Sequence, residues 1–387
     1  MATNYRYISA DSHLEVPPDR WGHRIPEKYR ELAPRRKTLP NGGDAFEIEG
    51  TGRTQRGGMN LYAGSSPEDF FPVGIKWDEC PGTGSPEQRL GEQDRDGIDA
   101  EVLYPGPGSR SLLTAVKDND AYRALVRAYN EWLAQEYCAV APDRLIGLGI
   151  LPDRGVDDAI DEMLYCRQLG LKGVELIAYP TGEKYPTAED DTFWASAIEA
   201  DMPVSIHVAV GGVRAQPHFK YPVEPPPDQN PNTDLVERTT RYARAGGVNA
   251  VQMVIHGLFD RLPKLKIYLA ENQIGWLPHF FEQLDNNYVK NCYWAQKLFG
   301  VPVLERRPSE YIKEHCYWGF MYDPVGVRLR HDIGVDHIMW STDFPHIESD
   351  WPNSMGVIEE TFVGVPQDEK YRMVAGNCIE FFHLEAV

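Results

Sequence analysis

The chain has 387 residues, 42% of them hydrophobic and 25% charged, which is ordinary for a globular protein with a sizeable core. Its 58 acidic residues outnumber its 39 basic residues, and the resulting net charge of -19 argues against nucleic acid or an anionic membrane surface as a partner. The six cysteines are scattered without a C-x-x-C pair, so neither a zinc ribbon nor a disulfide framework is indicated.

The N-terminal sequence MATNYRYISA lacks the basic and apolar regions of a secretory signal. No apolar run reaches the roughly 18 residues needed to span a bilayer. We therefore expect a cytoplasmic protein that acts on a small molecule and contacts no membrane.

The first predicted strand ends in the motif Asp11-Ser12-His13. Alternate residues of a strand point to the same side, so Asp11 and His13 can bind one ion together. A carboxylate and an imidazole suit zinc, iron or manganese. Taken alone, the motif is weak evidence for a metal site, because a strand-end turn with a surface Asp and His also explains it.

An insertion at 37–84 follows this first strand and holds many Gly and Pro residues interleaved with aromatic residues. Long insertions in compact domains tend to be lids or binding loops, and aromatic side chains are costly to leave exposed. We expect a lid or a subunit contact here, with a solvent-exposed excursion as the alternative. Burial against a second subunit would make the protein a homodimer or a larger homo-oligomer.

The rest of the chain alternates helical patterns with short apolar segments. A helix is predicted to begin at Ser85-Pro86, because serine is a good N-cap and proline suits the first helical position. Seven further strands are predicted at 99–105, 145–151, 172–177, 202–209, 266–271, 315–320 and 336–343. A second insertion, 211–232, follows the fifth strand of the chain, and the closing helices are expected to cover the outside of the fold.

Eight apolar segments separated mostly by helices are typical of an α/β protein of the (β/α)8 TIM barrel type, with insertions after strands 1 and 5. No G-x-G-x-x-G motif follows the first strand, which disfavours a dinucleotide-binding fold. We expect residues 1–387 to form one barrel domain.

Active sites of such barrels lie at the carboxyl ends of the strands. Those positions hold metal ligands or acid/base groups on five of the eight predicted strands: Asp11, His13, Glu175, His207, Glu271 and Asp343. Chance supplies one or two polar strand ends, so a set of six indicates a metal site.

With these residues the sequence resembles the amidohydrolase superfamily, in particular its amidohydrolase-2 branch, which includes aminocarboxymuconate semialdehyde and dihydroxybenzoate decarboxylases. The similar motifs are Asp11-Ser12-His13, the VSIH segment ending at His207, FDRLPKLKIYLAEN, and the WSTDFPH segment containing Asp343. The resemblance implies that Asp11, His13, His207 and Asp343 bind a divalent metal ion, with zinc expected first and iron or manganese as alternatives.

One position departs from that pattern. The decarboxylases carry a histidine on the sixth strand, in a pattern like L-x-H-x-G, where this chain has Glu271. By analogy with binuclear members of the superfamily, Glu175 is predicted to bridge two ions; a structural carboxylate paired with Lys172 or an arginine is the alternative. His346, three residues after Asp343, is a candidate acid/base group.

Because of this departure, the leading prediction is metal-dependent hydrolysis of an ester, thioester, lactone or amide in an apolar or aromatic small molecule. One or two ions would activate water, Asp343 would act as ligand and general base, and Glu271 or His346 would assist. The alternative is non-oxidative, metal-dependent decarboxylation of an aromatic acid, with His346 replacing the missing histidine. A third reading, a non-catalytic scaffold, is disfavoured because four buried polar groups are costly without an ion.

Overall fold

The computed structural model describes residues 4–210, 222, 235–240 and 245–385, so the predicted insertion at 211–232 lies outside the described residues except for residue 222. Eight parallel strands form a sheet in the order β1-β5-β6-β7-β8-β9-β10-β11. Their bounds are β1 Ile8–Leu14, β5 Ala100–Pro105, β6 Leu145–Ile150, β7 Gly173–Glu175, β8 Val204–His207, β9 Ile267–Ala270, β10 Cys316–Phe320 and β11 Ile338–Trp340. Each predicted strand is present, and the (β/α)8 barrel fold is confirmed.

The strands are buried on both faces, as parallel barrel strands are. In β6 every residue is buried, and Gly147 lets the side chains of Leu133 and Cys138, which precede the strand, approach closely. A methyl group at Gly147 would lie 2.8 Å from Cys138 Sγ. The short apolar runs therefore form strands because both of their faces have a surface to pack against.

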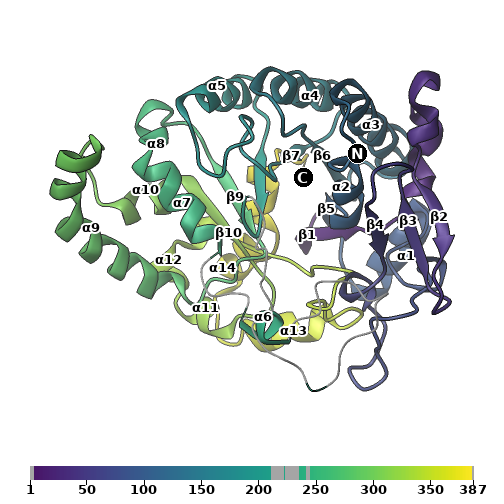
Figure 1. Ribbon diagram of the computed structural model, residues 1–387. Coiled ribbons are helices and arrows are strands. Elements are labelled where there is room, and N and C mark those ends of the chain that lie inside the picture. The colour runs from purple at the N-terminus through teal and green to yellow at the C-terminus, as the bar shows by residue number, and fades with distance from the viewer. Residues whose placement is uncertain (1–3, 211–221, 223–234, 241–244, 386–387) are drawn as a thin grey trace.

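Helices form an outer layer around the strands (Figure 1). α1, Pro86–Asp96, begins as predicted: Ser85 Oγ accepts a hydrogen bond from Gln88 N at 3.3 Å, and Pro86 takes the first helical position. The other helices before the closing segment are α2 Pro107–Leu113, α3 Asn119–Trp132, α4 Val156–Gln168, α5 Asp191–Glu199, α6 Leu235–Thr240, α7 Ala245–Ile255, α8 Leu258–Arg261, α9 Leu277–Phe299, α10 Pro308–His315, α11 Pro324–Arg328 and α12 Arg330–Ile333. No helix of the described residues is both long and apolar enough to cross a membrane.

The insertion after β1 carries a small antiparallel sheet of β2 Arg35–Thr38, β3 Asp44–Glu47 and β4 Thr54–Arg56. It contacts the barrel at several places. Arg53 Nε donates to Ser111 Oγ on α2, and the backbone N–H groups of Tyr62 and Ala63 donate to Pro345 O, in the loop after β11. The insertion thus lies at the mouth where the strands end, and its role as a lid or subunit contact stays a prediction.

The closing segment corrects one expectation. It contains α13 Ser354–Thr361, α14 Gln367–Tyr371 and α15 Asn377–Phe381, and its end does not cover the outside of the barrel. Phe381 and Phe382 pack beside Tyr268, with ring centroids 5.9 and 6.2 Å apart. They share a core cluster with residues that begin the barrel strands, including Ile8 and Ala100. Figure 1 accordingly shows the C-terminus inside the ring of strands, because these large apolar side chains fill the amino end of the barrel.

Candidate metal centre

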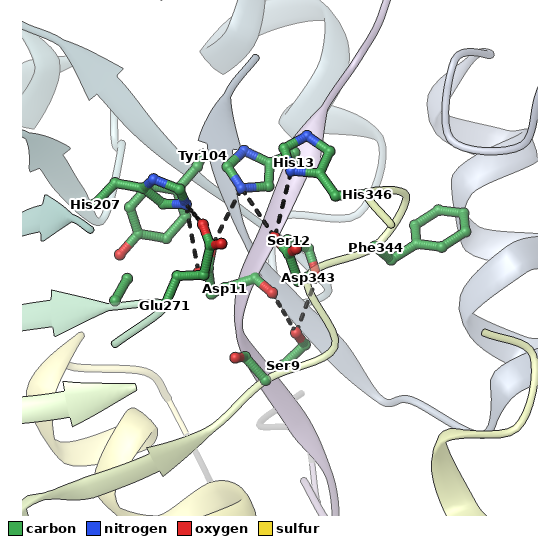
Figure 2. Close-up of polar contacts among 12 residues, drawn as sticks. Ser9, Asp11, Ser12, His13, Tyr104, His207, Glu271, Asp343, Phe344 and His346 are labelled. Carbon is green, nitrogen blue, oxygen red and sulfur yellow. Dashed lines mark hydrogen bonds and ion pairs between the residues drawn. The ribbon is translucent and has the colours of Figure 1, made fainter. Parts of the chain in front are cut away.

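Five side chains meet at the carboxyl end of the barrel (Figure 2). Asp11 and His13 lie on β1, His207 ends β8, and Glu271 and Asp343 follow β9 and β11. Each offers one donor atom, and the five atoms lie within 4.8 Å of one another. Four of the side chains have no exposed surface, and His207 is 9% exposed. The structure therefore brings together five of the six residues that the strand-end rule selected.

Both imidazoles direct Nε2 at carboxylate oxygens. His13 Nε2 lies 3.2 Å from Asp343 Oδ1 and 3.6 Å from Asp11 Oδ1. His207 Nε2 lies 3.1 Å from Glu271 Oε2 and 3.6 Å from Asp11 Oδ2. The Asp11 carboxylate thus lies between the two histidines, with one oxygen near each imidazole.

Three of the contributing strands end in the same unusual way. Val208, Glu271 and Asp343 have φ angles of 57°, 55° and 54°, in the left-handed region that residues other than glycine seldom adopt. Val208 and Glu271 lie immediately beyond β8 and β9, and Asp343 lies three residues beyond the end of β11. Backbone strain of this kind concentrates at functional sites, and here it turns the chain sharply where the donor groups converge.

The donor set fits a divalent cation. Three carboxylates lie within a few ångströms of one another in a buried region, where like charges repel strongly. Burial lowers the pKa of His13 well below its usual value, and the nearby charges of His346 and His207 lower it further, so His13 does not balance these charges. Imidazole nitrogens together with carboxylate oxygens suit zinc, iron and manganese alike. The cluster can therefore hold a divalent metal ion.

His346 lies against this cluster. Its ring stacks on that of His13 with a centroid separation of 3.8 Å, and its Nδ1 is 3.5 Å from Asp343 Oδ1. Its Nε2 lies 3.1 Å from Glu15 Oε1, which also accepts from Asn60 Nδ2 at 2.8 Å. Because Asn60 belongs to the insertion at 37–84, the insertion reaches the site through Glu15.

Glu175 is the predicted ligand that the structure leaves outside the cluster. Its carboxylate, fully buried at the end of β7, accepts a hydrogen bond from Arg110 Nη1 on α2. Burial raises the pKa of Glu175 to about 7, although Arg110 acts to lower it. This arrangement is the ion pair that the sequence left open as the alternative to a bridging ligand.

Tyr104 was missed by reasoning from the sequence. It lies on β5, hydrogen bonds with Ser205 Oγ, and places its ring 5.9 Å from that of His13 and 5.2 Å from that of His207. Burial raises the pKa of its hydroxyl well above the usual value, so the group is a neutral part of the cluster's surroundings. A tyrosine inside an apolar strand resembles any core residue, so the sequence carries no signal for this role.

Comparisons with known proteins agree on one family. A family model described as amidohydrolase matches residues 10–384. The chain is 26% identical over 305 residues to the gamma-resorcylate decarboxylase of Rhizobium sp. (strain MTP-10005), covering 74% of this chain and 86% of that protein. An amidohydrolase structure from Mycobacterium avium subsp. paratuberculosis aligns with a TM-score of 0.72 at 20% identity, covering 98% of this chain and all of that chain.

A dihydroxybenzoic acid decarboxylase from Polaromonas sp. JS666, with bound manganese and an inhibitor, aligns with a TM-score of 0.63 at 18% identity. The alignment covers all of this chain and 98% of that chain. Other curated relatives at a similar level are also decarboxylases.

These relatives overturn the prediction of hydrolysis, which was wrong. That prediction gave decisive weight to a single side chain, the glutamate at position 271. In the structure Glu271 joins the other donors, 3.1 Å from His207 Nε2, so a carboxylate at this position is no sign of a different reaction.

Proposed function

The chain belongs to the amidohydrolase family, whose model spans residues 10–384, and from this premise we propose that it is a metal-dependent decarboxylase of an aromatic carboxylic acid. The observation that carries the proposal is the buried cluster of two histidines and three carboxylates at the carboxyl end of a barrel whose curated relatives are decarboxylases. Gamma-resorcylate and carboxyvanillate, the substrates named for relatives and structural neighbours, are both hydroxylated aromatic acids, and we propose a substrate of this class.

In this proposal Asp11, His13, His207, Glu271 and Asp343 hold the ion. When bound, a divalent ion would supply positive charge that attracts the substrate carboxylate and an adjacent oxygen and offsets charge developing on the ring. Zinc, iron and manganese all suit the donor set. Four of the five side chains are buried and His207 is 9% exposed, so charges within the site act more strongly than they would in solvent.

Decarboxylation exchanges one bond for another: the ring carbon loses carbon dioxide, keeps the electron pair of the broken bond, and takes up a proton. Asp343 and His346 are placed to hold this proton, since Asp343 Oδ1 lies 3.5 Å from His346 Nδ1. Glu15 can accept the Nε2 proton of His346, which leaves the Nδ1 lone pair facing Asp343. We assign proton delivery to Asp343 and the positioning of that carboxyl group to His346.

The test is release of carbon dioxide from a panel of hydroxybenzoic acids that includes gamma-resorcylate and 5-carboxyvanillate. The protein is purified without chelator and loaded with Mn²⁺. We expect at least one acid to yield carbon dioxide and the corresponding phenol in equal amounts. Asp343→Asn, which cannot deliver a proton, should lose activity by a factor of about 10² or more.

Two results would contradict the proposal. One is the absence of carbon dioxide from every acid at full metal occupancy. The other is a wild-type rate in the Asp343→Asn protein.

A further inference from the structure

The barrel closes between β1 and β11, and the metal centre lies at this closure. Among the described residues the ladder of paired strands runs from β1 through β5 to β11, with no β1–β11 pairing in it. Two backbone hydrogen bonds join the ends of these strands instead: His13 N donates to Phe344 O at 2.7 Å, and Asp343 N donates to Asp11 O at 2.9 Å. We call residues 9–13 and 341–344 the seam.

Three hydroxyl groups lie within the seam, and Figure 2 labels two of the residues that carry them, Ser9 and Ser12. Ser9 Oγ, Ser12 Oγ and Thr342 Oγ1 lie 2.9 to 3.0 Å from one another, and Thr342 N donates to Ser9 Oγ at 2.9 Å. These side-chain hydrogen bonds thus add to the two backbone bonds across the seam. Since three of the five donor residues belong to the seam, its width sets the separation of Asp11 and His13 from Asp343.

Arg89 reaches both sides of the seam from α1. The side chain is 1% exposed, its Nη1 donates to His13 O at 3.0 Å, and its Nη2 lies 3.4 Å from Phe344 O. Its guanidinium carbon lies 4.5 Å from the centroid of the Phe344 ring. One rigid planar group therefore holds the backbone of His13, a ligand on β1, and that of Phe344, the residue after the ligand Asp343.

Glu101 fixes the guanidinium in place. Its Oε2 accepts from Arg89 Nε at 2.6 Å and from Gln93 Nε2 at 2.8 Å, and its Oε1 accepts from Arg89 Nη2 at 3.2 Å. Such two-point pairing is specific to arginine, because a lysine ammonium lacks the planar fork of donors. Glu101 lies on β5, the strand next to β1, so Arg89 is anchored to the barrel wall.

We propose that Arg89 is a positioning residue for the metal centre: by bridging His13 O and Phe344 O it sets the spacing between the ligands on β1 and Asp343, which follows β11, and thereby the affinity for the metal ion. The inference rests on the metal site of the proposed function and not on the reaction itself. A buried ion pair is commonly no more stabilising than well-packed apolar residues of the same volume. We therefore assign the Arg89–Glu101 pair a role other than stability, namely to fix the spacing of the metal ligands.

The test measures Mn²⁺ binding by titration calorimetry and thermal unfolding by circular dichroism. Arg89→Met removes the bridge but leaves Glu101 buried without its cation, so a loss of stability accompanies it. The double variant Arg89→Met/Glu101→Leu removes both charges and restores stability, because no unpaired buried charge remains. We expect both variants to bind Mn²⁺ about 10- to 100-fold more weakly than the parent chain, the range for partners that orient metal ligands.

Arg127→Met is the matched control. Arg127 pairs with Glu162 through Nε and Nη2 at 3.0 and 2.8 Å and lies over the Tyr165 ring at 4.1 Å, yet it joins α3 to α4 on the outer layer. We expect this variant to bind Mn²⁺ as the parent chain does. If the double variant regains both stability and parental Mn²⁺ affinity, Arg89 is merely structural and the inference is overturned. A parent chain that binds no Mn²⁺ would overturn the proposed function as well.

Discussion

At the scale of single residues, Glu175 shows how one neighbour decides what a buried carboxylate can bind. It ends β7, one of the barrel strands, but Arg110 faces its carboxylate. A guanidinium beside the carboxylate repels a second divalent ion, and this repulsion is strong where both groups are shielded from water. We therefore expect the protein to hold one ion rather than two.

Glu175→Gln should leave metal content unchanged, at about one ion per chain. The measurement is plasma mass spectrometry on protein purified without chelator, with His207→Ala as the variant that should lose metal. A fall from two ions to one in Glu175→Gln would instead support the bridging role that the sequence suggested.

His315 gives a pH dependence at the same scale. Its ring is 2% exposed, its Nδ1 lies 2.8 Å from Leu265 O, and it stacks on Phe259 with centroids 4.3 Å apart. Burial lowers the pKa of His315 in the folded protein. Below about pH 6.5 this histidine therefore binds a proton in the unfolded chain but stays neutral in the folded chain. The stability due to this residue is complete above that pH and is lost as the pH falls.

His315→Gln should therefore lose less stability than the parent chain between pH 7.5 and pH 5. The urea concentration at half unfolding, measured at both pH values for both proteins, checks this. Equal losses in the two proteins would show that His315 does not contribute.

At the scale of elements, the closing segment determines how the amino end of the barrel is filled. Phe381 and Phe382 enter the ring of strands and share a core cluster with Ile8, Ala100 and Tyr268. The closing segment thus fills the amino end of the barrel interior with its own side chains, and the metal centre lies at the opposite, carboxyl end. Stability and metal binding should therefore respond separately to changes at the two ends.

Phe382→Ala should lower the free energy of unfolding by about 3–5 kcal/mol, since the ring is 1% exposed and its removal leaves a cavity. The affinity for Mn²⁺ of the folded protein should not change. Val363→Ala is the control, because Val363 is 80% exposed and its truncation should cost less than about 0.5 kcal/mol. Denaturant unfolding and calorimetry measure both effects, and a weakened Mn²⁺ site in Phe382→Ala would show that the two ends are coupled.

The closing segment also marks how far sequence reasoning extends. Apolar runs bounded by turns predicted all eight strands, and the strand-end rule selected the five clustered donors because barrel geometry brings strand ends together. The same rule also selected Glu175, because its contact with Arg110 on α2 leaves no pattern in the neighbouring sequence that could have excluded it. Likewise, an amphipathic helix shows that one of its faces is buried but not against which surface, so the position of Phe382 could not be predicted.

At the scale of the whole molecule, α9 exposes an apolar surface. Its 23 residues carry five large apolar side chains that are between 49% and 68% exposed: Val289, Tyr293, Trp294, Leu298 and Phe299. Figure 1 shows α9 at the edge of the molecule. An apolar surface of this kind often marks an interface, in keeping with the predicted homodimer or larger homo-oligomer, which stays a prediction.

Light scattering should give a mass of at least twice 43.9 kDa for the full chain. Replacing both Leu298 and Phe299 with serine should lower that mass, whereas Val363→Ser, also at an exposed position, should not. A mass of one chain at all concentrations would contradict self-association.

The seam joins residues near the start of the chain to residues made much later, so it constrains when folding can finish during synthesis. Residues 9–13 leave the ribosome long before residues 341–344, and at about 5–20 residues per second the interval is on the order of tens of seconds. Throughout that time the open edge of β1 presents unpaired N–H and C=O groups to other nascent chains. We therefore expect rapid overexpression to increase the share of the protein that is lost to aggregates.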